Sequence, residues 1–254
     1  MEIRGRTREA DAFLEALENT RPDVVSTCEG WTAHEVTAHM VANCAEISRH
    51  LEPYLEGRDV PPTRSWEERE ASYRAMEDAR LRRLLEDEEE RMRRLIGDVL
   101  EREPEAAIPW TGRRMVVEKF IPHMRNEFAI HRWDFVGDDD VSVDALSQPE
   151  LTEHAVTVLG RLLLSRGAEH DPDPDHDFHV RLRVDGMPDV RLFVESGTSG
   201  LELAPEDDGE PGVTLDADAR TLVLWGRRPD GRGRFHSGLG MPALSRLQAL
   251  LSGY

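Results

Sequence analysis

The sequence feature that most constrains the fold is the segment from Phe120 to Phe135, which carries a glutamate and a histidine among apolar residues. If this segment is a helix, steps of three and four residues place Glu127 and His131 on the same stripe as Phe120, Met124 and Phe135. A carboxylate and an imidazole on such a face need partners, because an isolated buried charge is very costly. The two side chains lie one turn apart and can also reach one divalent cation, for which a third ligand must come from elsewhere.

Length and composition exclude several classes of protein. The 254 residues are enough for one large domain or two smaller ones with a proper core. No run of about 18 or more apolar residues and no apolar signal region is present, so we expect a cytoplasmic protein that does not span a membrane. The formal net charge of −19 argues against nucleic acid as a partner, because its phosphates would be repelled. Cys28 and Cys44 are the only cysteines, and we expect both to be free thiols.

The first part of the chain has the pattern of amphipathic helices. Residues 8–18 carry apolar side chains at helical spacing and predict a first helix. Thr32 and Glu35 have the spacing of a capping box, which predicts a second helix that begins at Ala33. The inward stripe of the second helix consists of Val36, Met40, Cys44 or Asn43, Ile47 and Leu51. His39 lies beside Met40, near the middle of that inward face.

The next segment predicts a loop and one long helix. Pro53 and the Pro61–Pro62 pair bound the loop, and a second capping box at Ser65 and Glu68 opens a helix that continues to about Val99. Its outer face is dense in Glu and Arg and predicts a solvated surface. The stretch 108–112 predicts a turn, and Pro122 either lies in the first turn of the following helix or kinks it.

The pattern changes in the second half of the chain. A helix at 148–165 is followed by residues that alternate in polarity, which predict strands at 178–184 and 190–194 joined by a turn. Further short strands are predicted at 201–203, 213–215 and 234–236, and helices at 218–226 and 242–251. The predicted fold class is therefore α+β, with a four-helix bundle at 1–144 and a smaller α+β domain at 145–254.

Three candidate metal ligands lie on two inward helix faces: His39, Glu127 and His131. Two histidines and one carboxylate form the ligand set of many open catalytic zinc sites, which leave a fourth position for water or substrate. Spacing alone is more typical of a buried structural histidine that is hydrogen-bonded to a glutamate on the same helix. His123 lies one turn before Glu127 and could face the site, either as a partner or at its rim.

Other motifs carry less weight. The spacing between His34 and His39 is one residue too long for the zincin pattern, and no Gly-rich phosphate loop or Gly-x-Ser-x-Gly elbow is present. Cys28 could act as a nucleophile only with a base nearby. We expect Arg125 and Asp134 to form ordinary salt bridges.

Two segments together resemble the mycothiol-dependent maleylpyruvate isomerase family, which belongs to the DinB-like metal-binding helical bundles. They are Ser26-Thr-Cys28-Glu-Gly-Trp31-Thr32 followed by His39, and Arg125-Asn-Glu127-Phe-Ala-Ile-His131-Arg-Trp-Asp134. The segment Leu222-Val-Leu-Trp225-Gly226-Arg227-Arg228 resembles the second domain of that family more loosely. The resemblance covers nearly the whole chain.

The resemblance implies a DinB-like up-down four-helix bundle that holds a divalent metal, usually zinc, through His39, Glu127 and His131. Members bind a small-molecule thiol, typically mycothiol, as a thiolate at the open metal position. In the isomerase, the thiolate would add to the conjugated double bond of the substrate, permit rotation and then leave, whereas related proteins transfer the thiol to an electrophile. The second domain would wall the pocket, and Arg227 or Arg228 could pair with a substrate carboxylate.

These inferences leave three hypotheses of function. The first is a metal-dependent isomerase or S-transferase whose partners are a small thiol and a small electrophilic substrate. The second is a non-catalytic DinB-like module that binds or senses a ligand. The third is a metal hydrolase, which needs a general base such as His123 beside the open position. The sequence is compatible with a monomer.

Overall fold

The structure is a computed structural model that describes residues 5–28, 30–205, 209, 212–229 and 235–252. It divides into two compact units, Met1–Asp138 and Asp139–Tyr254. The first is mostly helical and the second contains a five-stranded sheet, so the predicted α+β fold class is confirmed. The expected boundary after residue 144 lies inside α6 (Asp140–Leu146), which packs against α9 (Ala217–Leu224) of the second unit.

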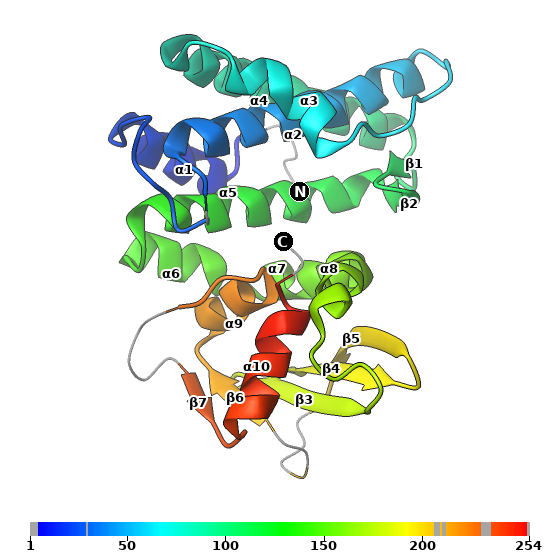
Figure 1. The fold of residues 1–254 in the computed structure, drawn as a ribbon. Helices are drawn as coiled ribbons and strands as arrows, with labels where there is room; N and C mark the ends of the chain where they lie inside the picture. The colour runs from blue at the N-terminus through cyan, green and yellow to red at the C-terminus, as the bar shows by residue number, and fades with distance from the viewer. Residues whose placement is uncertain (1–4, 29, 206–208, 210–211, 230–234, 253–254) are drawn as a thin grey trace. The chain divides into compact units, whose positions relative to one another are not determined.

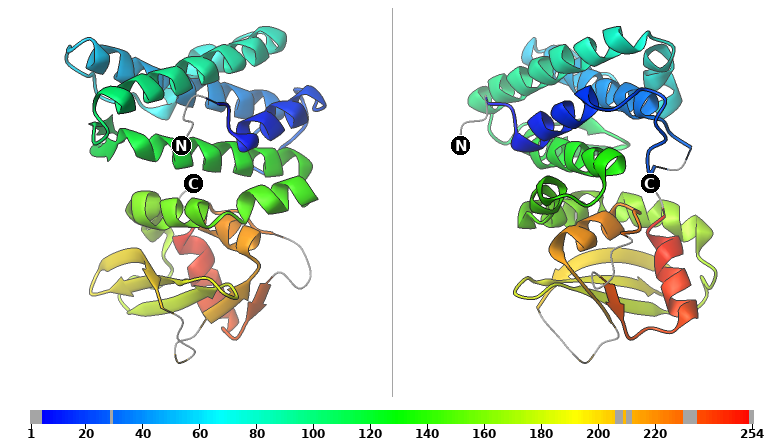
Figure 2. Two further views of the ribbon diagram at one scale, coloured as in Figure 1. Left: turned by 180° about the vertical axis from the view of Figure 1, so that it is seen from behind. Right: turned by 90° about the vertical axis from the view of Figure 1, so that its left-hand side faces the viewer.

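The N-terminal unit is the predicted four-helix bundle, coloured from blue to green in Figure 1. Its principal helices are α1 (Arg8–Glu18), α2 (Ala33–Leu55), α4 (Asp78–Arg102) and α5 (Phe120–Val136). The shorter elements are α3 (Trp66–Arg74), the strands β1 (Ala107–Trp110) and β2 (Arg113–Val116), and the 3-10 turn η1 (Val117–Lys119). Helix α1 packs against α5, and α2 packs against α3, α4 and α5 (Figures 1 and 2).

Helix α2 begins at Ala33, as the capping box predicts. The side chain of Thr32 accepts a hydrogen bond from the Glu35 backbone N–H, and a Glu35 carboxylate oxygen accepts one from the Thr32 N–H at 2.7 Å. The predicted apolar stripe of the helix is fully buried. His39 is thereby held on the inward face, with 3% of its surface exposed.

We expect Thr32→Ala to lower the free energy of unfolding by about 1 kcal/mol, because an N-cap hydroxyl satisfies a backbone donor that no helical carbonyl can reach. Urea unfolding of the purified protein measures this change. Thr32→Ser keeps the hydroxyl and is expected to retain most of the stability. An equal loss in both variants would show that the methyl group, rather than the cap, matters at this position.

The prediction of one long helix between Ser65 and Val99 is wrong, because the chain turns between α3 and α4. The side chain of Glu77 accepts hydrogen bonds from the N–H groups of Ala79 and Arg80 at 3.0 and 2.9 Å and so caps a new helix. Neither glycine nor proline marks this break. The separate helix α3 packs against α2 and contributes a side chain to the site described below.

The structure decides three local expectations, of which two differ from the prediction and one confirms the first alternative for Pro122. The stretch 108–112 belongs to a β-hairpin, in which Thr111 and Gly112 adopt positive φ angles of 45° and 79°. Pro122 lies in the first turn of α5, where a missing backbone N–H costs little. Pro53 lies within the last turns of α2 and does not bound the following loop.

The C-terminal unit combines helices with a mixed sheet, coloured from green to red in Figure 1. Its helices are α6 (Asp140–Leu146), α7 (Pro149–His154), the π-helical segment η2 (Ala155–Leu159), α8 (Gly160–Gly167), the 3-10 turn η3 (Ala168–His170), α9 (Ala217–Leu224) and α10 (Met241–Leu250). Its strands are β3 (Phe178–Arg183), β4 (Asp189–Glu195), β5 (Thr198–Ala204), β6 (Gly212–Leu215) and β7 (Phe235–Ser237). Residue 234, at the start of the last predicted strand, lies outside the described residues. Helix α6 was not predicted, and Asp139 caps it by accepting from the Ser142 N–H at 2.7 Å.

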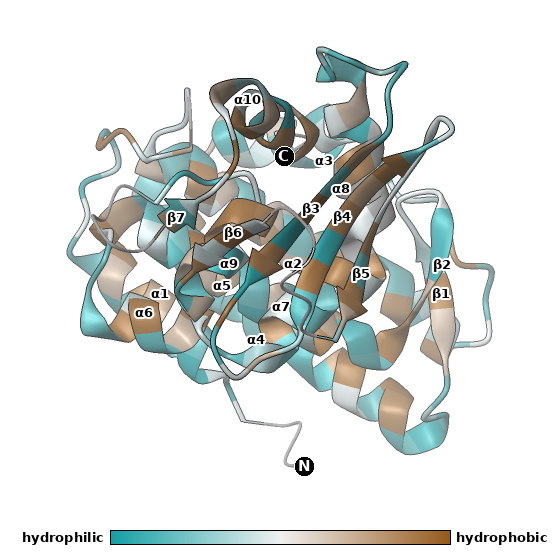
Figure 3. Cartoon of the chain, turned by 90° about the horizontal axis from the view of Figure 1, so that it is seen from below, coloured by the Kyte–Doolittle hydropathy of each residue, from teal (hydrophilic) through white to brown (hydrophobic). Residues whose placement is uncertain are grey.

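The strand order of the sheet is β5-β4-β3-β6-β7, with β3 and β6 parallel and the other neighbours antiparallel. Leu182 of β3 lies opposite both Val190 of β4 and Val213 of β6, and all three side chains are buried. Hydrophobic and hydrophilic residues both occur along β3 and β4 (Figure 3), as expected for strands with one buried face. Within the described residues, no helix has the length and hydropathy that crossing a bilayer requires.

Candidate metal centre

His39, Glu127 and His131 come together where α2 meets α5. His39 lies on α2, whereas Glu127 and His131 lie one turn apart on α5. All three side chains are buried, and one potential ligand atom from each lies within 4.8 Å of the other two. Among the described residues, this is the one group of three or more His, Cys, Asp or Glu side chains that is close enough to hold a metal ion.

The distances within the cluster fit a small divalent cation. Nε2 of His39 lies 3.3 Å from Oε2 of Glu127, and Nε2 of His131 lies 3.5 Å from the same oxygen. A tetrahedral cation with bonds of about 2.0–2.1 Å separates its ligand atoms by about 3.3–3.4 Å. The two measured separations are close to that value and longer than a typical N–H···O hydrogen bond.

Each histidine uses its other ring nitrogen to bind a carboxylate. Nδ1 of His39 lies 2.7 Å from Oε1 of Glu70, and Nδ1 of His131 lies 2.8 Å from Oδ2 of Asp134. A carboxylate accepts a hydrogen bond, so Nδ1 carries a proton and, in the neutral ring, Nε2 carries a lone pair. Metal-ligating histidines are usually held in this way by a carboxylate or carbonyl. In the neutral rings both Nε2 lone pairs can therefore bind a cation beside Glu127, whereas a proton on Nε2 would be donated to the Glu127 carboxylate.

The electrostatics of the cluster favour a positive charge at its centre. Burial alone would raise the pKa of Glu127, but hydrogen bonds with His131 and His39 hold it well below its usual range. Burial likewise opposes the charged form of His131, but Asp134 and Glu127 together raise its pKa. The Asn43 amide donates to Nε2 of His39 at 2.9 Å and lies 3.5 Å from Oε2 of Glu127. The positive charge beside the Glu127 carboxylate can come from a proton or from a metal cation. The proton corresponds to the structural interpretation, and the cation corresponds to the metal-binding interpretation.

Aromatic rings and an arginine surround His39. The rings of Trp31 and Trp66 meet its imidazole edge-on, with centroids at 5.2 and 5.9 Å. The Arg74 guanidinium lies 4.7 Å from the centre of the Trp31 ring and also donates to Glu70 at 2.8 Å. Helix α3, which carries Trp66, Glu70 and Arg74, therefore fixes the orientation of the His39 ring.

The loop before α2 is tied to the end of α5. The Thr27 hydroxyl donates to Oδ1 of Asp134 at 2.5 Å, and the Thr27 N–H donates to the Asp134 carbonyl at 3.1 Å. Asp134 pairs with His131, as the expectation of a salt bridge requires, and the same carboxylate also joins His131 to the loop. The same expectation for Arg125 is confirmed, since Arg125 pairs with the buried Glu9 at 2.9 Å.

His123 faces Glu127 without a hydrogen bond between them. Its Nε2 atom lies 3.9 Å from Oε1 of Glu127, and its ring lies against Trp110 with centroids at 6.1 Å. Burial lowers the pKa of His123 to about 4, because the attraction of Glu127 does not offset the loss of water. This environment favours the uncharged imidazole of His123, and its role as a general base stays a prediction.

The remaining sequence candidates lie outside the cluster or are poor nucleophiles. His34 bonds to Asp78 at 3.0 Å and to the Arg74 carbonyl at 3.1 Å, so the zincin-like spacing has no counterpart here. Both cysteines are free thiols, as expected. Cys44 is buried, and burial raises the pKa of its thiol well above the usual value, which disfavours the reactive thiolate. Cys28 is half-buried.

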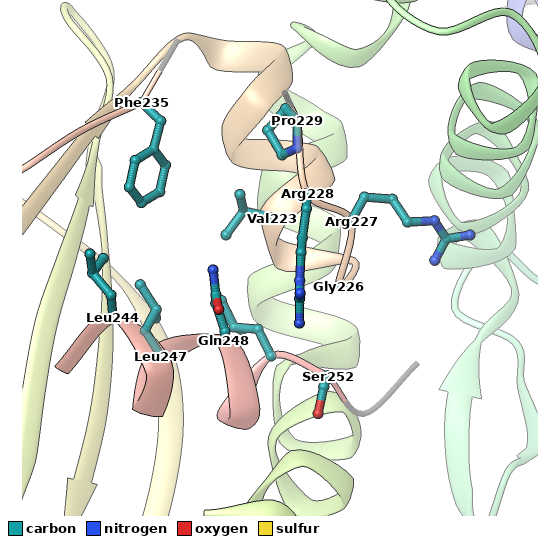
Figure 4. A pocket seen from close by; sticks show the side chains of 11 residues that line it. Val223, Gly226, Arg227, Arg228, Pro229, Phe235, Leu244, Leu247, Gln248 and Ser252 are labelled. Carbon is teal, nitrogen blue, oxygen red and sulfur yellow. The ribbon is translucent and has the colours of Figure 1, made fainter. Parts of the chain in front are cut away.

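Arg227 and Arg228 lie in the C-terminal unit and line a pocket there (Figure 4). Arg227 is buried, and its Nη1 donates to the Trp225 carbonyl at 3.1 Å. Arg228 is exposed and extends along the pocket. Their role in binding a substrate carboxylate stays a prediction.

Comparison with known proteins places the chain in a family. Residues 3–135 match the family described as mycothiol maleylpyruvate isomerase N-terminal domain. The chain belongs to this family. The matched region includes His39, Glu127 and His131, so all three candidate ligands lie in the domain that defines the mycothiol maleylpyruvate isomerase family. No curated protein matches the sequence.

Two crystal structures resemble both units. One is a mycothiol-dependent maleylpyruvate isomerase, with a TM-score of 0.59 and 20% identity. The other is a mutant of a mycothiol-dependent maleylpyruvate isomerase in which a histidine is replaced by alanine, with a TM-score of 0.62 and 18% identity. Each alignment covers 88% of this chain and 87% of the other. This likeness confirms the predicted arrangement of a helical bundle followed by a sheet-containing region.

The sequence did not predict that Glu70 and Asn43 contact the two ring nitrogens of His39. Asn43 follows His39 by one helical turn on the inward stripe, so its spacing could have indicated a contact with the site. No comparable signal exists for Glu70, because its position depends on the break between α3 and α4.

Proposed function

We propose that this protein is a metal-dependent enzyme that uses mycothiol as its thiol cosubstrate. His39, Glu127 and His131 would hold a divalent cation, and zinc suits this set of two nitrogens and one oxygen best. The observation that carries the proposal is the convergence of two histidine Nε2 atoms on one carboxylate oxygen, at 3.3 and 3.5 Å. Membership of the mycothiol maleylpyruvate isomerase family supports the choice of thiol.

The protein side chains would prepare the site for a thiol. A bound divalent cation supplies the positive charge that lowers the pKa of a thiol and keeps it as a nucleophilic thiolate at neutral pH. Glu70 and Asp134 hold the Nδ1 protons of the two histidines and so keep both Nε2 lone pairs directed at one point. With His39, Glu127 and His131 as its protein ligands, the cation would still have room for the thiol sulfur. The half-buried rings of Trp31 and Trp66 would limit the access of water.

The reaction that fits best is the isomerisation of a small conjugated acid that resembles maleylpyruvate. The thiolate sulfur would add to the conjugated double bond, rotation would follow about the resulting single bond, and elimination would return the thiol unchanged. Transfer of the thiol to an electrophile shares the first of these steps and differs in that the sulfur is retained by the product.

Turnover assays with the zinc-loaded full-length protein test this proposal. We expect conversion of maleylpyruvate, or conjugation of a small electrophile, to fall at least about 100-fold when either mycothiol or zinc is omitted, because each is needed to form the nucleophile. Turnover that is independent of the thiol would contradict the proposal. Stoichiometric metal binding without turnover of any electrophile would instead support the alternative of a non-catalytic binding or sensory module.

A further inference from the structure

A pocket of about 330 Å³ lies within the C-terminal unit. It is bordered by α9, by the segment that follows α9, and by α10 (Figure 4). Its apolar lining consists of Val223, Phe235, Leu244, Leu247 and Leu251. Its polar lining includes Arg228, Gln248 and Ser252. The volume is at the lower end of the range of about 300–1,000 Å³ that is typical of small-molecule sites.

The two neighbouring arginines point in different directions. Figure 4 shows the Arg227 side chain leaving the pocket and the Arg228 side chain extending along its edge toward Gln248 and Ser252. Nη1 of Arg227 is bonded to the Trp225 carbonyl. Within the described part of the chain, no carboxylate pairs with Arg228, and no hydrogen bond engages the Gln248 amide. Both groups are exposed at the rim and can bind a ligand without first losing a protein partner.

The chemistry of the lining selects a class of ligand. A guanidinium has the geometry to bind a carboxylate through two parallel hydrogen bonds, and the Gln248 amide can donate to the same group. Opposite Arg228, the pocket wall is formed by Val223, Phe235 and Leu247. These described lining residues carry only hydrocarbon side chains. A second charged group on the ligand would meet this wall without a partner, so a dicarboxylate fits poorly.

We propose that this pocket binds a small monocarboxylate with a hydrocarbon body. The carboxylate pairs with the Arg228 guanidinium and the Gln248 amide, and the hydrocarbon body packs against Val223, Phe235 and Leu247. Every lining residue belongs to the C-terminal unit. Binding therefore requires none of the candidate metal ligands, and the proposal goes beyond the proposed thiol chemistry.

Isothermal titration calorimetry of the full-length protein with sodium octanoate and with neutral octanamide tests the proposal. We expect octanoate to bind about tenfold more tightly than octanamide, because the carboxylate gains a charge-assisted hydrogen bond. Arg228→Gln should remove this preference by weakening octanoate about tenfold and leaving octanamide unchanged. Equal binding of the two probes to the wild type, or no binding of either, would overturn the proposal.

Three further variants separate the parts of the inference. Leu244→Gln at the half-buried wall should weaken both probes several-fold, since it replaces apolar surface. Arg94→Gln, on the exposed face of α4, is the matched control and should leave both affinities unchanged. His39→Ala should also leave octanoate binding unchanged, whether or not the proposed enzymatic function is correct. Loss of octanoate binding in Arg94→Gln or His39→Ala would contradict a pocket confined to the C-terminal unit.

Discussion

Replacing His39 or Glu127 with alanine is expected to remove the bound metal and to lower kcat/KM with mycothiol at least about 1,000-fold. Each variant keeps two of the three donors, which is too few for a stable site with one open position. Loss of the cation removes the charge that keeps the thiol ionised, and a barrier about 4 kcal/mol higher corresponds to this factor. Elemental analysis of the purified variants and steady-state kinetics measure the two effects.

Two matched controls belong to this experiment. His34→Ala changes a histidine on the same helix that bonds to Asp78 instead of the cluster. Glu118→Gln changes an exposed glutamate shortly before α5. Both controls should keep a full complement of metal and near wild-type activity. Full metal content in His39→Ala and Glu127→Ala would show that the cluster is only a structural hydrogen-bond network.

The second large effect is expected from Glu70, which touches His39 but not the proposed cation. Glu70→Gln should lower the affinity for zinc about 10–100-fold, because a neutral amide polarises the His39 ring less than a carboxylate does. The loss should appear in competition titrations against a chromophoric chelator. Added zinc should restore activity, since all three ligands remain.

Glu67→Gln is the control for this variant, because Glu67 lies on the same helix but is exposed. Its affinity for zinc should stay within about twofold of the wild type. If Glu70→Gln binds zinc as tightly as this control, the 2.7 Å contact between Glu70 and Nδ1 of His39 has no part in metal binding.

The parts of the site that the sequence predicts are those set by local periodicity. Glu127 and His131 lie one turn apart on a stripe that also contains Phe120, so helical geometry alone places them on the same inward face. The capping box fixes the start of α2 and with it the inward orientation of His39. Periodicity cannot show that the two helices are neighbours. The expectation that His39 meets Glu127 and His131 came from the family resemblance.

The parts that could not be predicted depend on contacts between distant segments. The break between α3 and α4 lacks glycine and proline, and Glu77 acts as a cap only because the chain turns there. Glu70 reaches His39 only as a result of that turn. The C-terminal pocket likewise depends on α10 approaching the segment after α9, since Arg228 and Gln248 are far apart in sequence.

The most direct test of the central claim is a crystal structure of the zinc-loaded protein with anomalous diffraction data collected at the zinc absorption edge. We predict one strong anomalous peak at about 2.0–2.2 Å from Nε2 of His39, Nε2 of His131 and a carboxylate oxygen of Glu127. No peak at this position, with zinc bound elsewhere or not at all, would contradict the claim that these three side chains form a metal centre.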